Sequence, residues 1–269
     1  MAGGKKPVKG IPKRQRQGND DLVRHGMRSH ARPPETAIPP AYALSRRRYE
    51  ISNIGEFMAV NEARIPRSFF CFGASAGGIE ALIAILDRLP TDLDATVAIV
   101  VHRSPTAASA LVDIFARHSR MPVVEPIDGD PIRRRMVYLA PQDRHLIMEG
   151  ERWRIEEGTS VHRWRPAVDP LFLSVAKYLG KTAVGVLLSG GGADGVDGLT
   201  EIKKRGGVSI AQDPRQALQD SMPKSAIKHD DVDLVLRLEQ IAAIIPSLAA
   251  GEIVGDGDSG GLLAGGTRH

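Results

Sequence analysis

The sequence predicts an α/β fold: a doubly wound, mainly parallel sheet with helices on both faces and an antiparallel hairpin excursion. Two observations predict it. From residue 68 onward, short apolar runs alternate with segments whose apolar residues repeat at helical spacing. Several runs are apolar throughout, as expected for strands buried on both faces of a sheet. With 269 residues and 42% hydrophobic content, the chain is long enough for one large domain of this kind.

The first half of the domain supplies three strands, two helices and a hairpin. The apolar run at 69–73 predicts a buried strand, and 77–89 predicts a helix because its apolar residues fall on one face. The β-branched run at 95–102 predicts a second buried strand. A Ser-Pro start signal opens a helix at 104–119, and 122–126 is a short strand. Segments 134–141 and 145–157 are predicted as strands around a hairpin, spanning 137–156, with its turn at Glu149–Gly150.

The second half repeats the alternation. A helix at 167–180 ends at Gly180, which suits a C-cap. The long apolar run at 182–190 predicts a third major strand, and a helix at 194–207 again closes on glycine. Two short strands at 208–212 and 233–238 and a last helix at 239–250 complete the pattern. The segment around His229 is predicted to be a polar loop.

Composition divides the chain into three parts. Residues 1–65 form a basic, Pro-rich leader that we expect to be disordered, 66–250 form the folded domain, and 251–269 form a Gly-rich, disordered tail. Residues 1–50 hold 12 Lys/Arg against 4 Asp/Glu, whereas the rest holds 24 against 28. The overall charge of +4 therefore comes from the leader. Such a leader could contact nucleic acid, an acidic protein or a membrane surface, although a solvated segment is the simpler interpretation.

Several function classes are excluded or disfavoured. Aromatic content of 4% does not suggest base stacking, so no nucleic acid is expected as a partner. The single cysteine, Cys71, rules out an internal disulfide and fits a reducing compartment. Neither a signal peptide nor an apolar run long enough for a membrane span is visible. We expect a cytoplasmic protein with no cofactor and no metal, since no His/Cys/acid ligand pattern occurs.

The turn after the first strand carries the strongest chemical signal. Residues 73–77 read G-A-S-A-G, which matches the G-x-S-x-G pattern of a serine nucleophile at a strand-to-helix bend. Ser75 would be exposed at the bend, and the N–H of Ala76 would face a developing oxyanion. A dinucleotide site requires G-x-G-x-x-G, and Ser75 stands where the central glycine belongs. A plain tight corner remains the third interpretation.

A nucleophilic serine needs a base and an acid at the same edge of the sheet. His102 ends the second strand, and Asp194 follows the third major strand between two glycines. Parallel strands place their carboxyl ends together, so Ser75, His102 and Asp194 are the candidate triad. The alternative chain order would use His229 as the base. Asp194 has a second interpretation as the N-cap of its own helix.

These stretches together resemble the catalytic domain of the CheB family, the chemotaxis protein-glutamate methylesterases. The resemblance runs from about 69 to 248 and is carried by "GASAGGIEAL", "IVVHRSP", "GDPIRRRMVYLAPQDRHL", "RWRPAVDPLF", "VGVLLSGGGADGVDGL", "IKKRGG", "SIAQD", "MPKSAI" and "VDLVL". It implies a doubly wound α/β fold with Ser75 as nucleophile, His102 as base and Asp194 as the orienting acid. It also implies hydrolysis of glutamyl methyl esters on methyl-accepting chemoreceptors with release of methanol, and deamidation of certain receptor glutamines.

The sequence departs from the family pattern in three places. Members usually carry a receiver domain ahead of the esterase, which residues 1–65 do not supply, so phosphorylation control in cis is not expected. Ala76 stands where a hydroxyl residue often follows the nucleophile, and Gly191 replaces the usual methionine. Backbone N–H groups of Ala76, Gly191 and Gly192 are the candidate oxyanion donors.

The candidate substrate contacts are basic. Arg103 and Arg165, together with Arg163, would face a glutamate-rich receptor surface, although solvated arginines would look the same in the sequence. The expected function is therefore a methylesterase. The alternatives are a CheB-like receptor-binding or regulatory module without full activity and, less in keeping with the motif, a nucleotide-binding domain.

Overall fold

The computed structural model describes residues 65–103, 110–161, 163–230 and 232–251. The predicted disordered leader and tail therefore lie outside the described residues, apart from the single residues 65 and 251 at their edges. The start of the helix predicted at 104–119 also lies outside them.

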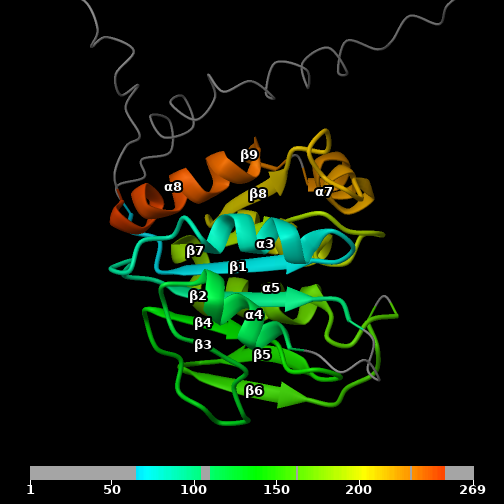
Figure 1. Cartoon of the computed structure of the whole chain (residues 1–269). Helices are drawn as coiled ribbons and strands as arrows, with labels where there is room; N and C mark the ends of the chain where they lie inside the picture. The colour runs from blue at the N-terminus through cyan, green and yellow to red at the C-terminus, as the bar shows by residue number, and fades with distance from the viewer. Residues whose placement is uncertain (1–64, 104–109, 162, 231, 252–269) are drawn as a thin grey trace, which may run out of the picture. The chain divides into compact units, whose positions relative to one another are not determined.

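A seven-stranded parallel sheet forms the centre of the described domain (Figure 1). Its strand order is β3-β4-β2-β1-β7-β8-β9, and every pairing is parallel. A separate antiparallel pair is formed by β5 (His145–Glu149) and β6 (Arg152–Glu156). The predicted fold class is thus confirmed. The sheet strands are β1 (Phe69–Ala74), β2 (Thr96–Val101), β3 (Val123–Val124), β4 (Met136–Leu139), β7 (Ala183–Leu187), β8 (Val208–Gln212) and β9 (Leu234–Leu236).

The helices cover the two faces of the sheet in two layers, and each layer packs on its own apolar core. One face of the sheet packs against α3 (Gly78–Leu86), α4 (Leu111–His118) and α8 (Leu238–Ala250). The other face packs against α5 (Val168–Leu179), α6 (Val196–Lys204) and α7 (Ser221–Asp230), and against the β5–β6 hairpin. A 3₁₀ turn, η2 (Gly180–Thr182), links α5 to β7. Side chains of β1 alternate between the two cores, with Phe70 and Phe72 in one and Phe69 and Cys71 in the other.

Two local predictions were wrong. The segment around residues 136–139 was predicted to belong to the antiparallel hairpin, but β4 lies in the main sheet, parallel to β2 and β3. The segment around His229 was predicted to be a loop, but it forms the last turn of α7. Met222 and Ala226 are buried while Lys224 and Lys228 are exposed, a helical period that the flanking polar residues obscure.

The register brings the three predicted strand ends to one edge. Ala74 at the end of β1 pairs with Val101 at the end of β2, and Gly73 pairs with Leu187 at the end of β7. The loops that follow β1, β2 and β7 therefore leave the sheet side by side. Within the described part of the chain, no helix has the length and apolarity to span a bilayer.

Candidate active site

The turn after β1 is fixed by reciprocal bonds to the loop after β7. The Ser75 N–H donates to the Ser189 carbonyl (2.9 Å), and the Ser189 hydroxyl donates to the Ala76 carbonyl (2.7 Å). Gly77 adopts a left-handed φ of 76° and is followed at once by α3. The left-handed residue of the bend is thus Gly77, where the lack of a Cβ removes the steric cost.

Glycines around Ser75 are needed because neighbouring side chains come close to their backbone. A Cβ on Gly73 would lie 2.5 Å from Val168 Cγ1, and one on Gly77 would lie 2.6 Å from Leu218 Cβ. A Cβ on Gly190 would lie 2.8 Å from the Ser75 Cβ. Ser75 itself is partly exposed, and among the described residues its hydroxyl makes no hydrogen bond. Bonds and close packing hold the turn, and its hydroxyl is available.

His102 lies directly beside this turn. Its N–H donates to the carbonyl of Ala74, the residue before Ser75 (3.0 Å). Its imidazole is buried, and Nε2 forms a hydrogen bond of 2.6 Å with Asp194 Oδ2. The other ring nitrogen, Nδ1, is buried without a hydrogen-bond partner among the described residues. The indole of Trp164 stacks on the imidazole, with ring centroids 4.5 Å apart and planes 11° from parallel.

Asp194 precedes α6, and its buried carboxylate lies against the first residues of α5. Its Oδ2 also accepts the Val168 N–H (2.8 Å), and its Oδ1 accepts the Asp169 N–H (3.1 Å). Asp194 does not cap its own helix α6, whose N-cap is Gly195 without a side-chain bond. Burial raises the pKa of Asp194, but the hydrogen bond from His102, the two backbone N–H groups and the histidine charge outweigh it, so the pKa falls below its ordinary value. Asp194 is therefore an ionised partner for an imidazole.

A second buried carboxylate, Asp169, was not singled out from the sequence. Its Oδ1 accepts the Gly198 N–H in the first turn of α6 (2.8 Å). Burial raises its pKa, and the nearby charge of Asp194 adds to this, while hydrogen bonds from Gly198 and Gly195 oppose it. Its only sequence signal is an acid in the first turn of a helix, which is a common surface feature.

The three backbone donors proposed for the oxyanion differ in their availability. Within the described residues, the N–H groups of Ala76 and Gly191 donate no hydrogen bond. The Gly192 N–H donates to the Ser221 hydroxyl (3.2 Å). The N–H groups of Ala76 and Gly191 can thus donate to a ligand without breaking an existing hydrogen bond. The Gly192 N–H would first have to give up its bond to Ser221.

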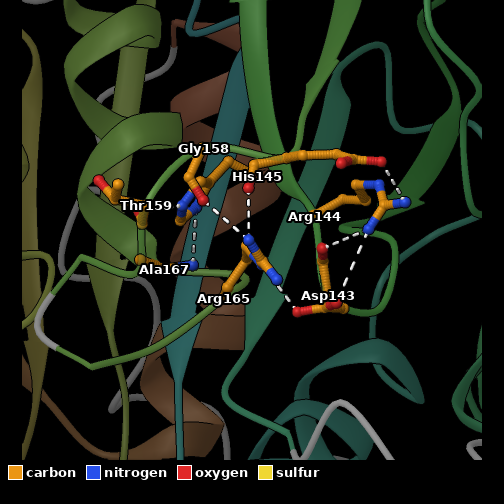
Figure 2. Close-up of polar contacts among 8 residues, drawn as sticks. Asp143, Arg144, His145, Gly158, Thr159, Arg165 and Ala167 are labelled. Carbon is orange, nitrogen blue, oxygen red and sulfur yellow. Dashed lines mark hydrogen bonds and ion pairs between the residues drawn. The ribbon is translucent and has the colours of Figure 1, made fainter.

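The arginines predicted as substrate contacts are engaged within the chain. Arg103 donates to Glu125 Oε1 (2.6 Å) and to the Ala140 carbonyl, and its side chain is nearly buried. Arg165 donates to Asp143 Oδ1 (2.7 Å) and to loop carbonyls, as Figure 2 shows. Arg163 is exposed. Structural bonds therefore already occupy Arg103 and Arg165.

The remaining histidines of the described residues have other surroundings. His145 is buried, accepts the Ala167 N–H at Nδ1 (3.3 Å) and bonds to the Thr159 carbonyl through Nε2 (3.1 Å). His118 pairs with Asp87 at the surface, and His229 is exposed on α7. No group of three or more potential metal ligands occurs among the residues that the structure describes.

Comparison with known proteins gives consistent results. Residues 70–245 match the family model for CheB methylesterase. The chain is 39% identical over 176 residues to protein-glutamate methylesterase/protein-glutamine glutaminase 2 of Anaeromyxobacter dehalogenans, covering 65% of this chain and 52% of that protein. It is 40% identical over 191 residues to protein-glutamate methylesterase/protein-glutamine glutaminase 1 of Xanthomonas campestris, covering 70% and 53%.

A solved structure agrees with the observed fold. The crystal structure of the Thermotoga maritima CheB methylesterase catalytic domain aligns with a TM-score of 0.65 and 29% identity, covering 68% of this chain and all of that one. The chain spans about half the length of the curated bacterial relatives above. Since the family model covers most of the chain and these relatives and this structure agree with it, the chain belongs to the CheB methylesterase family.

Proposed function

We propose that this chain is a serine hydrolase that removes methyl groups from glutamyl methyl esters of chemoreceptors in the cytoplasm. The observation that carries the proposal is the buried His102–Asp194 hydrogen bond (2.6 Å) beside the turn that carries Ser75. The names of the relatives support the substrate class, and they also suggest glutamine deamidation as a second reaction.

In the acylation step, His102 Nδ1 takes the proton from Ser75 Oγ while Oγ attacks the ester carbonyl. Asp194 stabilises the imidazolium through its bond to Nε2. The N–H groups of Ala76 and Gly191 hold the oxyanion, and loss of one such donor typically costs about 10²–10³ in rate. The imidazolium then gives its proton to the methoxy oxygen, methanol leaves, and a glutamyl–Ser75 ester remains.

Deacylation repeats the same proton transfers with water. His102 Nδ1 accepts a proton from water, the resulting hydroxide oxygen attacks the acyl-enzyme, and the proton returns to Ser75 Oγ. The products are the receptor glutamate and the free enzyme. For a glutamine substrate the leaving group is ammonia, and the sequence of transfers is the same.

This mechanism assigns the roles of the two ring nitrogens. Nε2 is bound to the carboxylate, so Nδ1 is the nitrogen with a lone pair for Ser75. The His102 N–H donates to the carbonyl of Ala74, next to Ser75, so the imidazole begins beside the turn that it is proposed to serve. Catalytic hydrogen bonds often tighten only when substrate binds, so a rotation of the Ser75 hydroxyl toward Nδ1 is part of the proposal.

The test measures methanol released from methylated chemoreceptor. The wild-type chain should release methanol, Ser75→Ala should reduce release to background, and Ser247→Ala, on the distant helix α8, should match the wild type. Equal rates for wild type and Ser75→Ala would refute Ser75 as the nucleophile. Receptor binding without methanol release would favour the alternative of a receptor-binding or regulatory module.

A further inference from the structure

The base of the proposed triad is covered by one aromatic side chain. Trp164 lies parallel to the His102 imidazole, with centroids 4.5 Å apart and an interplanar angle of 11°. Trp164 is 37% exposed, whereas the His102 side chain has no exposed surface. The indole therefore has one face on the imidazole and further surface in solvent. The bond to Asp194 fixes one atom of the ring, and the stack fixes the plane of the ring.

A polar cluster fixes the turn that carries Trp164. The backbones of Trp164 and Val161 bond to each other in both directions, at 2.8 and 3.1 Å. The adjacent Arg165 donates through Nε to Asp143 Oδ1 (2.7 Å) and through Nη1 to the carbonyls of Glu157 and Gly158. Figure 2 shows this guanidinium between Asp143 and the Gly158 carbonyl.

The charges of this cluster are matched. The hydrogen bond from Arg165 lowers the pKa of Asp143 and raises that of Arg165, so both remain ionised. Asp143 and Arg163 have left-handed φ values of 57° and 72°, which are uncommon for residues with a Cβ. Unusual backbone conformations of this kind persist only where surrounding contacts determine them. The Arg165 bonds are such contacts.

We propose that Trp164 is a positioning residue for His102, and that Arg165, through Asp143 and the carbonyls of residues 157 and 158, holds Trp164 on the imidazole. The proposal rests on the function proposed above and adds two residues to it. It reassigns Arg165 from a receptor contact to a residue that acts through Trp164. By covering the imidazole, the indole keeps the plane of the His102 ring directed from Asp194 toward Ser75.

The kinetic test separates positioning from substrate binding. With methylated chemoreceptor, Trp164→Ala should lower kcat by roughly tenfold to a hundredfold, because small misplacements of a catalytic group cost about this much. KM should change by no more than about twofold, since positioning acts on the chemical step. Trp164→Phe should recover most of the rate, whereas Trp164→Leu should not.

A double-mutant cycle tests the link to Arg165. Arg165→Ala should lower kcat as Trp164→Ala does, and the double variant should be no slower than the slower single variant, because both changes remove one contact. Arg154→Ala is the matched control, since the side chain of Arg154, on β6, makes exposed ion pairs with Glu149 and Glu156 and no other polar contact among the described residues. It should keep wild-type kcat and KM.

A spectroscopic arm does not depend on activity. In the full chain carrying Ser75→Ala, the His102 ring protons should lose their indole ring-current shift on adding Trp164→Ala and, at least in part, on adding Arg165→Ala. Unchanged His102 resonances would overturn the contact. A rise in KM with unchanged kcat in Trp164→Ala, or wild-type kcat in Trp164→Leu, would overturn the positioning role. Absence of any Ser75-dependent hydrolysis would instead refute the proposed function, while the spectra still report on the stack.

Discussion

The His102 ring is bound at one nitrogen only, so the structure predicts its tautomer. Nε2 faces the ionised Asp194 at 2.6 Å, and Nδ1 has no partner among the described residues. The neutral imidazole should therefore carry its proton on Nε2 and a lone pair on Nδ1. Nitrogen-15 spectra of the full chain at alkaline pH measure this directly. A neutral ring protonated on Nδ1 would contradict the assignment of roles in the mechanism.

Two neighbouring glycines give a matched pair of stability predictions. A Cβ at Gly190 would lie 2.7 Å from Met222 Sδ and 2.8 Å from Ser75 Cβ, whereas a Cβ at Gly191 meets nothing within 4 Å. Gly190→Ala should therefore lower the free energy of unfolding by about 1–3 kcal/mol through overpacking. Gly191→Ala should change it by no more than about 0.5 kcal/mol.

Urea unfolding of the two variants measures the difference, and the wild type is the reference. Equal effects at both positions would contradict the packing described around Ser75. The open space at Gly191 also means that a side chain could begin there without a clash at its Cβ.

Among single residues, the candidate triad could be named from the sequence because each member follows an obvious buried strand. The structure shows the His102–Asp194 hydrogen bond, and the contact between Ser75 and His102 stays a prediction. Trp164 and Asp169 were missed for a physical reason. Their important contacts, with His102 and Gly198, join segments far apart in the chain. No periodicity or local motif reports such contacts.

At the scale of elements, carboxylates at the starts of α5 and α6 accept hydrogen bonds from the first backbone N–H groups of the other helix. Asp194, just before α6, accepts N–H groups at the start of α5, and Asp169, in the first turn of α5, accepts an N–H in the first turn of α6. This exchange satisfies backbone donors that a helix start leaves open. It also gives a physical reason for an acid in this loop, because the same bonds orient the Asp194 carboxylate toward His102.

The two carboxylates have opposite effects on stability as pH changes. The pKa of Asp194 is lowered in the fold, so its contribution is present above the unfolded value and is lost as pH falls through the folded value. The pKa of Asp169 is raised, so its ionisation costs stability, and that cost is full above its folded pKa.

Asp169→Asn tests this sign. The amide keeps an oxygen for Gly198 and removes the buried charge. The stability of Asp169→Asn relative to wild type should be most favourable above the raised pKa of Asp169. That advantage should shrink as the pH falls toward 3.8, the ordinary pKa of an aspartate. Urea unfolding of both proteins across this pH range is the measurement. An advantage that grows on acidification would contradict the account.

Some strands and helices could be predicted from sequence patterns and others could not. Strands β1, β2 and β7 were predictable because burial on both faces leaves an unbroken apolar run. The prediction for β4 was wrong because its parallel partner β2 is distant in sequence. The sequence pattern favoured pairing with the strand that follows directly, as in a hairpin. Helix α7 was missed for two reasons. Pro223 suggests a break in a sequence pattern, although proline is tolerated in the first turn of a helix, and polar residues flank the short buried stripe of α7.

For the whole molecule, the strand order explains where the candidate site lies. From the central β1 the chain first adds β2 on one side, and it later adds β7 on the other. Loops at the carboxyl ends of adjacent strands diverge where the order reverses, and ligands of open α/β sheets bind at such points. Ser75, at the end of β1, lies at this place.

The buried thiol reports on the integrity of the whole sheet. Cys71 lies in β1, donates to the Val184 carbonyl (3.3 Å) and has its pKa raised by burial. A thiol reagent should therefore modify Cys71 only when the domain unfolds, and labelling should follow the urea unfolding transition. Labelling of native protein as fast as that of denatured protein would contradict the packing of β1.

Joint action of Ser75, His102 and Asp194 is best tested by covalent labelling with a fluorophosphonate, followed by mass spectrometry of the peptides. One adduct, on Ser75, should form, and it should form much more slowly in His102→Ala and in Asp194→Asn. An adduct on another residue, or equal labelling rates in the wild type and His102→Ala, would refute joint action of the three residues.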